Sequence, residues 1–270
     1  MCELFAMSAA VPTAIGFRLE RLARRGGLEG PHRDGWGVAA YEGRDAYLLR
    51  EPRAAAESEM VHFIEHHIPP TCQVISHIRY ATQGDRALCN TQPFQRELGG
   101  RIHAFAHNGD LRGIGSHPDA HARRHAPVGT TDSEVAFCTL LERLHPLWER
   151  ARGEPPPLAE RWAAIACFAG ELRAFGPANF LYADSDALFL HADRRTQDNG
   201  CIEPPGLHVL EQRCNEEAQG ELPAAGIRIA EPCETTVLVA SVPLTEGPWT
   251  PLARGQLAAL VGGRLLRCAE

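Results

Sequence analysis

The second residue of the chain is a cysteine, in the opening sequence MCELFAMSAAVP. If Met1 is removed, as happens when a small residue follows the initiator, Cys2 becomes the first residue. It then carries a thiol and an α-amine on neighbouring carbons, and such an amine has a pKa of about 8. The amine can accept the proton that the thiol loses, as in enzymes with an N-terminal threonine nucleophile. Cys2 is therefore a candidate nucleophile, and the alternative is a small apolar core residue.

Four other polar stretches lie in turns or at the ends of expected strands, where a rigid scaffold holds functional groups. They are HRDGWG (32–37), SHIRYATQG (76–84), AHNGD (106–110) and GTTDSE (129–134). Each has an ordinary explanation on its own: Asp-Gly and Asn-Gly are common in turns because these residues accept a positive φ. Read together with Cys2, they form a more specific pattern.

This pattern resembles the class II glutamine amidotransferase domain, an N-terminal-nucleophile (Ntn) hydrolase, and within that family the stand-alone YafJ-like proteins. The resemblance extends over nearly the whole chain, from CELFAMSA (2–9) through CNTQPFQRELGG (89–100) to ASVPLTEGPW (240–249). It implies an α+β fold, a four-layer αββα sandwich of two antiparallel sheets between helix layers. It also implies a cysteine-dependent amidohydrolase that cleaves the γ-glutamyl amide bond of glutamine or a related linear γ-glutamyl compound.

The resemblance gives the catalytic residues their roles. Cys2 is the nucleophile that forms a γ-glutamyl thioester. Asn108 and Gly109 match the oxyanion hole, a side-chain amide and a backbone N–H that stabilise the charged oxygen of the tetrahedral intermediate. The alternative for Asn108-Gly109 is a hairpin bend, and both descriptions can hold at once.

The resemblance also implies a set of substrate-binding residues. Arg79 matches the residue that binds the substrate α-carboxylate, a task suited to a planar fork of donors; the alternative is a surface ion pair. Asp132 matches the residue that binds the α-ammonium, and the alternative is a helix cap. The remaining expected pocket residues are His77, Thr82 and Trp36.

One position departs from the family pattern. Gln92 stands in the sequence NTQPF where relatives often carry His. An amide can occupy that position, so the departure leaves open the local hydrogen bonding and the preferred leaving group.

Composition excludes several other functions. The 270 residues carry a net charge of −7, and all 27 basic residues are Arg, which excludes Schiff bases and phosphate-binding loops that need Lys. No basic run predicts a nucleic-acid partner. No segment reaches the roughly 18 apolar residues of a membrane span and no signal peptide is evident, so a cytoplasmic location without membrane contact is expected.

Cysteine and histidine spacing gives no metal or disulfide pattern. The nine Cys include no C-x-x-C pair, and the His residues at spacings of four, in 62–66 and 117–125, are not part of an H-E-x-x-H motif. We therefore expect neither a metal nor another cofactor, and a solvated loop over 116–127. A non-enzymatic metal- or redox-responsive protein is the alternative of a different class.

The patterns along the chain predict the elements that position these residues. Helices are expected over about 12–25, 55–67, 131–152 and 157–172. Strands are expected over 35–43, 46–52, 72–82, 101–109 and 235–244, with hairpins over 179–193 and 255–267. Pro-rich 152–160 and Glu-rich 211–226 are expected loops.

Strands and helices in separate blocks predict an α+β fold. With 44% hydrophobic residues and no linker between the elements, we expect a single domain over 2–270. No acceptor domain follows the motifs, so two alternatives stay open. The chain acts alone as a hydrolase, or it is a glutaminase subunit that delivers ammonia to a separate synthetase partner.

Overall fold

The computed structural model describes residues 2–17, 32–121, 124–212, 227–230 and 235–267, which form two antiparallel sheets. The larger sheet has the order β14-β11-β13-β1-β4-β2-β3, with β12 also paired to β1. Its strands are β1 (Glu3–Phe17), β2 (Trp36–Glu42), β3 (Asp45–Glu51), β4 (Thr71–Ile78), β11 (His208–Gln212), β12 (Ile227–Ala230), β13 (Thr236–Ala240) and β14 (Thr250–Pro251).

The smaller sheet has the order β16-β15-β8-β7-β6-β5. Its strands are β5 (Phe94–Leu98), β6 (Arg101–Asn108), β7 (Asn179–Ala183), β8 (Leu188–His191), β15 (Leu257–Val261) and β16 (Arg264–Arg267). A separate two-stranded ribbon joins β9 (Arg195–Thr196) to β10 (Ile202–Glu203).

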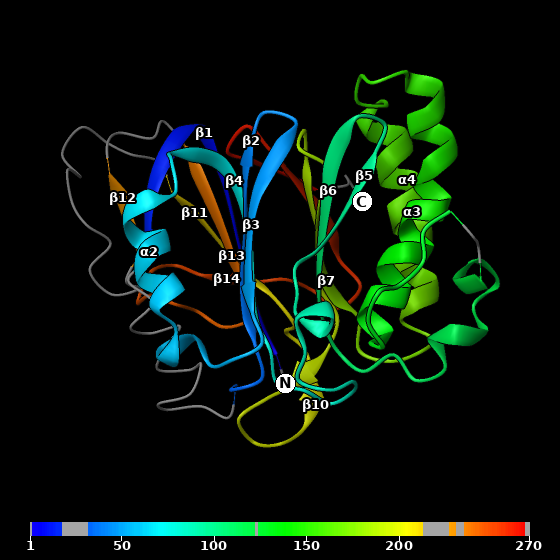
Figure 1. Ribbon diagram of the computed structural model, residues 1–270, viewed down its shortest axis with the longest axis horizontal. Helices are drawn as coiled ribbons and strands as arrows, with labels where there is room; N and C mark the ends of the chain where they lie inside the picture. The colour runs from blue at the N-terminus through cyan, green and yellow to red at the C-terminus, as the bar shows by residue number, and fades with distance from the viewer. Residues whose placement is uncertain (1, 18–31, 122–123, 213–226, 231–234, 268–270) are drawn as a thin grey trace.

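Helices lie outside the two sheets (Figure 1). Helix α2 (Glu59–His67) packs on the outer face of the larger sheet, and α3 (Asp132–Ala151) and α4 (Leu158–Leu172) cover the outer face of the smaller one. Short 3₁₀ turns complete the described elements: η2 (Ala55–Glu57), η3 (Leu88–Asn90), η4 (Ile114–Ser116) and η5 (Pro118–His121). The α+β class with two stacked antiparallel sheets is confirmed.

Three apolar clusters hold these layers together, and the alternation of side chains along β1 explains how one strand serves two of them. Leu4 and Ala6 enter the cluster between the two sheets, whereas Phe5 and Met7 enter the cluster under α2. The third cluster lies between the smaller sheet and the α3–α4 pair. A residue of β1 or of a neighbouring strand can therefore reach the space between the sheets only if its side chain is on the inner face of the larger sheet.

The expected helix over 12–25 is wrong for residues 12–17, which continue β1; residues 18–25 lie outside the described part of the chain. Thr13 pairs with Thr71 of β4, and 14–17 pair with β12. Strand pairing on both sides outweighs the helical spacing, helped by the β-branched Val11, Thr13 and Ile15.

The other expected helices are present, with 55–67 divided into η2 and α2. The expected strands and both hairpins are also present, whereas β5, β11 and the short strands β9, β10, β12 and β14 were not expected. The expected solvated loop over 116–127 is corrected: it includes η5, and His117 is buried with Nε2 2.9 Å from Glu171. Of the expected loop 211–226, Glu211 and Gln212 end β11 and the rest lies outside the described residues.

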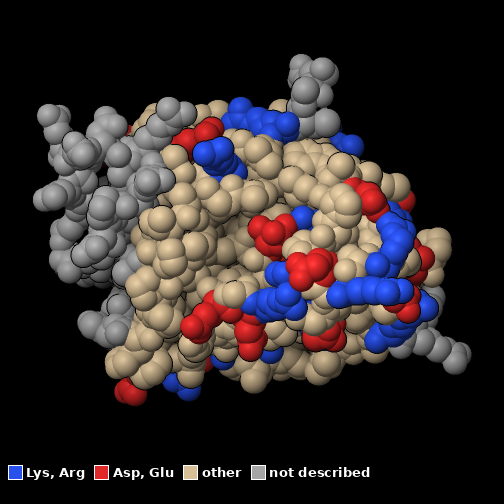
Figure 2. All heavy atoms as spheres, turned by 90° about the horizontal axis from the view of Figure 1, so that it is seen from above, with Lys and Arg blue, Asp and Glu red and all other residues tan. Residues whose placement is uncertain are grey.

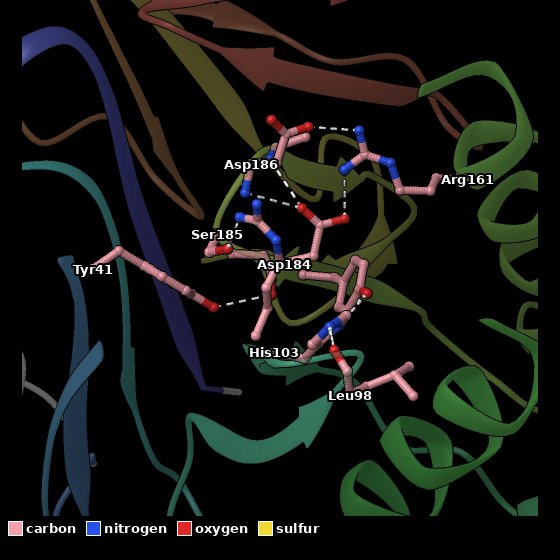
Figure 3. Close-up of polar contacts among 11 residues, drawn as sticks. Tyr41, Leu98, His103, Arg161, Asp184, Ser185 and Asp186 are labelled. Atoms are coloured by element: carbon pink, nitrogen blue, oxygen red, sulfur yellow. Dashed lines mark hydrogen bonds and ion pairs between the residues drawn. The ribbon is translucent and has the colours of Figure 1, made fainter. Parts of the chain in front are cut away.

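A buried ion pair fixes α4 to the turn between β7 and β8 (Figure 3). Arg161 donates to Asp184 at 2.8 Å and to Asp186 at 2.6 Å, and the side chains of Arg161 and Asp184 are almost completely buried. Burial raises the pKa of Asp184, and the guanidinium of Arg161 opposes that effect. Nearby, Nε2 of His103 lies 2.9 Å from the Leu98 carbonyl and must donate to it, so Nδ1 accepts from the Tyr182 hydroxyl at 2.6 Å.

We expect Arg161→Met to lower the free energy of unfolding by about 3–5 kcal/mol, because the Asp184 carboxylate would stay buried without its partner. The urea midpoint of the purified variant measures this. The matched control is Arg150→Met, which removes the exposed Arg150–Glu160 pair and should change stability by at most about 1 kcal/mol. Equal losses in the two variants would contradict a specific role for the buried pair.

Surface charges are mixed in sign on the face seen in Figure 2, where Arg side chains lie beside Asp and Glu side chains. Exposed ion pairs of the described chain include Arg44–Glu154 at 3.2 Å. No helix of the described residues is long and apolar enough to cross a membrane.

Candidate active site

The sheet register brings the polar stretches to one end of the sandwich. Ile78, at the end of β4, pairs with Glu3 on one side and with Trp36 on the other. Cys2, Arg79 and the loop before β2 therefore lie together where these three strands begin or end. In the smaller sheet, β6 ends at Asn108, opposite Asn179 at the start of β7. The main chain and the charge of His107, next to Asn108, act on the ring of His77, so the end of β6 lies beside the end of β4.

The thiol of Cys2 lies against the backbone of Tyr80. The Tyr80 N–H donates to Sγ at 3.3 Å, and Sγ lies 3.4 Å from the Tyr80 carbonyl, to which the S–H donates. Burial raises the pKa of Cys2. The hydrogen bond from Tyr80 and the positive charges of the N-terminal ammonium and Arg79 lower it, and the charge of Asp132 raises it. The net shift keeps the thiol protonated at neutral pH, so nucleophilic attack requires a base.

Arg79 is buried and is not part of a surface ion pair, being 3% exposed. Its guanidinium donates to three backbone carbonyls of one loop: Asp85 at 3.0 Å, Gln83 at 2.8 Å and Gly84 at 2.9 Å. A guanidinium has five N–H donors, so two remain for another acceptor within the described structure. Arg79 therefore shapes the 83–85 loop and still has donors to offer a carboxylate.

Asn108 is buried, and neither atom of its side-chain amide has a hydrogen-bond partner within the described chain. Its backbone is held firmly, because Nδ2 of Asn179 donates to its carbonyl at 3.0 Å. A Cβ on Gly109 would lie 1.8 Å from the Pro177 carbonyl, so only glycine fits there. A buried amide without a partner is costly, and a fixed, unused donor is what an oxyanion hole needs.

Asp132 is the first residue of α3, and the residue that caps the helix is Thr131, whose side chain accepts from the Glu134 N–H at 3.3 Å. One carboxylate oxygen of Asp132 accepts from the Leu111 N–H at 2.7 Å and the other from the Ser133 N–H at 2.8 Å. The carboxylate is thereby fixed beside the turn that follows Gly109. Lone pairs remain on both oxygens for an ammonium group.

His77 points into the space between the sheets, because it is paired with Leu4, whose side chain lies there. Neither ring nitrogen makes a well-aligned hydrogen bond within the described structure, although the main chain of His107 lies close to the ring. Burial lowers the pKa of His77 to about 3, with further lowering by the charges of Arg79, His107 and His32, and the main chain of His107 raises it slightly. His77 is therefore a neutral imidazole at physiological pH.

The two remaining expected pocket residues differ in position. Thr82 is exposed in the loop that follows Arg79. Trp36 lies in the cluster under α2, on the face of the larger sheet opposite to His77. The structure does not bring the Trp36 ring together with His77 and Leu4, because successive strand residues alternate between faces.

Gln92 holds the end of β6. Its Oε1 accepts from the His107 N–H at 2.6 Å. The pairing of β5 with β6 ends at Phe94 and Phe105, so the Gln92 side chain takes the place of a strand partner for His107. The ring of His107 is fixed as well: Nε2 lies 3.2 Å from the Pro177 carbonyl and donates to it, so Nδ1 accepts from the Ser133 hydroxyl at 2.9 Å. The amide at position 92 thus makes a main-chain contact directly before Asn108.

Sequence reasoning missed the contribution of Tyr80, Asn179 and Ser133. Tyr80 contacts Cys2 through backbone atoms, for which a side-chain type gives no signal. Ser133 lies within the GTTDSE stretch, so its neighbourhood was identified but its contact was not. Among the described side chains, no three His, Cys, Asp or Glu residues gather as metal ligands.

A sandwich of two antiparallel sheets between helices, with a cysteine at the start of a central strand, is the architecture of the Ntn-hydrolase amidotransferases. Comparison with known proteins agrees with this class. The family model described as class II glutamine amidotransferases matches residues 1–270. The chain belongs to this family.

Particular relatives can also be named. A putative glutamine amidotransferase of Escherichia coli, YafJ, is 44% identical over 184 residues, which are 68% of this chain and 70% of that protein. A putative glutamine amidotransferase of Haemophilus influenzae is 37% identical over 191 residues, which are 71% of this chain and 63% of that one.

Solved structures show the same fold. A predicted glutamine amidotransferase from Pseudomonas aeruginosa has a TM-score of 0.69 at 35% identity, covering 100% of both chains. The glutamine phosphoribosylpyrophosphate amidotransferase of Bacillus subtilis has a TM-score of 0.61 at 17% identity, covering 98% of this chain and 49% of that one. The second likeness shows the fold alone, and it covers about half of the larger enzyme.

Proposed function

We propose that this chain hydrolyses the γ-glutamyl amide bond of glutamine or a related linear γ-glutamyl compound through a thioester on Cys2. The observation that carries the proposal is the buried amide of Asn108, which has no partner among the described residues. Asn108 follows His107, whose main chain acts on His77, the strand partner of Leu4 next to the start of β1. Family membership supports it. Arg79 and Asp132 supply the positive and negative groups that an α-amino acid requires.

The reaction begins with transfer of the thiol proton to the α-amine of Cys2, which is free once Met1 is removed. Sγ then attacks the side-chain carbonyl carbon, and the carbonyl π electrons move to its oxygen. Asn108 Nδ2 and the Gly109 N–H stabilise that oxyanion. Collapse breaks the C–N bond, and the leaving nitrogen takes the proton from the ammonium of Cys2. Water attacks the thioester by the same steps and releases glutamate.

The direct test is turnover by the purified chain against a panel of γ-glutamyl amides, with an α-glutamyl amide as the control. The proposal expects release of amine or ammonia from at least one γ-glutamyl compound and none from the α-glutamyl control. If the chain is instead a glutaminase subunit for a separate synthetase, the chain alone will turn over none of the panel.

Arg79→Lys is expected to lower kcat/KM by about tenfold to a hundredfold. Lys supplies the charge without the fork, and a charged hydrogen bond contributes about 1.5–3 kcal/mol. The control substrate is the neutral α-amide analogue. Its kcat/KM should be low with the parent enzyme and should fall little further with the variant.

Because Arg79 also binds three loop carbonyls, the substitution is expected to lower thermal stability as well. The ratio of kcat/KM for the carboxylate and the α-amide separates the two effects. If that ratio survives both Arg79→Lys and Arg79→Ala, Arg79 does not recognise the carboxylate and serves only the loop.

A further inference from the structure

We infer that Asp34 is a positioning residue that sets the acidity of the Cys2 thiol by fixing the two peptide units on either side of Tyr80. This inference rests on the proposed role of Cys2 as the nucleophile. Asp34 has no contact of its own with Sγ, so its effect passes through the main chain.

Each of the two peptide units is hydrogen-bonded to Asp34 on one side and contacts the Cys2 thiol on the other. In the first unit, the Arg79 carbonyl accepts from the Asp34 N–H at 3.3 Å, while the Tyr80 N–H donates to Sγ of Cys2 at 3.3 Å. In the second, the Ala81 N–H donates to Oδ2 of Asp34 at 2.8 Å, while the Tyr80 carbonyl faces Sγ at 3.4 Å. The C=O and N–H of a trans peptide point in opposite directions. In each unit, Asp34 therefore bonds the group that points away from the thiol, while the opposite group of the same unit contacts Sγ.

The loop around Asp34 adds one further bond of the same kind. The Arg79 N–H donates to the Gly35 carbonyl at 2.8 Å, so residues 34 and 35 hold three main-chain groups, two of Arg79 and one of Ala81. Of these contacts, only the one to Ala81 is made by a side chain. A change at position 34 can therefore remove that bond while leaving the backbone bonds of 34 and 35 in place.

The consequence for the thiol follows from the charged groups around it. The N-terminal ammonium and Arg79, at the end of β4, stabilise the thiolate, and Asp132, at the start of α3, destabilises it. The neutral imidazole of His77 adds no charge. The Tyr80 N–H is the described hydrogen-bond donor to Sγ, and a donor to an anion favours the charged form. Loss of the Asp34 side chain frees only the second unit, because the first stays bound through the Asp34 N–H. When the second unit rotates, the Tyr80 carbonyl turns away from Sγ, the S–H loses its acceptor and the pKa of Cys2 falls.

The test measures the rate of Cys2 alkylation by iodoacetamide against pH, resolved by peptide mass spectrometry because Cys167 and Cys201 are exposed. We expect Asp34→Ala to lower the pKa of Cys2 by about one unit, which makes alkylation near neutral pH about tenfold faster. The matched control is Asp45→Ala, which removes a carboxylate that accepts from the N–H of the following residue, Ala46, at 2.8 Å at the start of β3. Its profile should equal that of the parent.

Two more variants separate position from charge. Asp34→Asn keeps an acceptor for the Ala81 N–H and loses the charge, so its pH profile should stay near that of the parent. Asp34→Glu keeps the charge and displaces the acceptor by one methylene, so its profile should shift towards that of Asp34→Ala. If charge were the cause, Asp34→Asn would instead lower the pKa and Asp34→Glu would leave it unchanged. That order would overturn the inference.

Alkylation requires no substrate, so the result is independent of turnover. An unchanged Cys2 profile in folded Asp34→Ala and Asp34→Glu would overturn the inference even if both variants were slow enzymes. Should Asp34→Ala fail to fold, Asp34→Glu and Asp34→Asn still decide the matter. Failure of the γ-glutamyl panel, by contrast, would defeat the proposed function and leave the thiol measurement standing.

Discussion

Replacing Cys2 with alanine is expected to abolish amide hydrolysis while leaving the fold intact. Cys2 precedes β1, and the strand is held by pairing to β4 and β13 and by the bond from the Leu4 N–H to Ser241 at 3.0 Å, none of which needs the thiol. Without Sγ no thioester can form, and Ala has no group that could replace it. Turnover of the γ-glutamyl panel, measured beside thermal unfolding, gives the result.

Cys138→Ala is the matched control, because Cys138 is buried in α3 and burial raises its pKa to about 11. That variant should keep its kcat and lose only stability. Full activity of Cys2→Ala, or loss of activity only in Cys138→Ala, would refute the assignment of the nucleophile.

Asn108→Ala is expected to reduce kcat by about a hundredfold to a thousandfold, equivalent to about 2.7–4 kcal/mol, because an oxyanion donor acts mainly in the transition state. KM should hardly change. Stability should not fall by a similar amount, since the amide has no hydrogen bond to lose in the described structure.

Asn108→Asp extends this test, because it keeps the shape of the side chain and replaces the donor with a negative charge. It should be at least as slow as Asn108→Ala. A large rise in KM at constant kcat in either variant would show that Asn108 binds the ground-state substrate and not the oxyanion.

Much of the site could be predicted from the sequence, because its residues stand at strand ends and in turns whose letters are specific. Cys2, Arg79, Asn108 and Asp132 lie at or next to the ends of β1, β4, β6 and α3. When the two sheets stack, the ends of these strands come close together. The polar stretches in the sequence therefore predicted where the residues lie as well as which chemistry they could perform.

The residues that were misplaced or missed depend on facts that single-residue patterns do not contain. Trp36 is next to a loop of the site in sequence, but the alternation of β2 turns its ring towards α2. The segment 12–17 has helical spacing, yet pairing with β4 and β12 decides its structure. The Tyr80 contact is made by backbone atoms, and Gln92 acts through a main-chain N–H of a strand distant in sequence.

The most direct measurement is the mass of the covalent intermediate. The purified chain would be mixed with a γ-glutamyl substrate that it turns over, quenched in acid within one turnover and digested for peptide mass spectrometry. The account predicts a glutamyl group on Sγ of Cys2, in a peptide whose first residue is Cys2. A glutamyl group on another residue, or full activity of a chain that retains Met1, would contradict it.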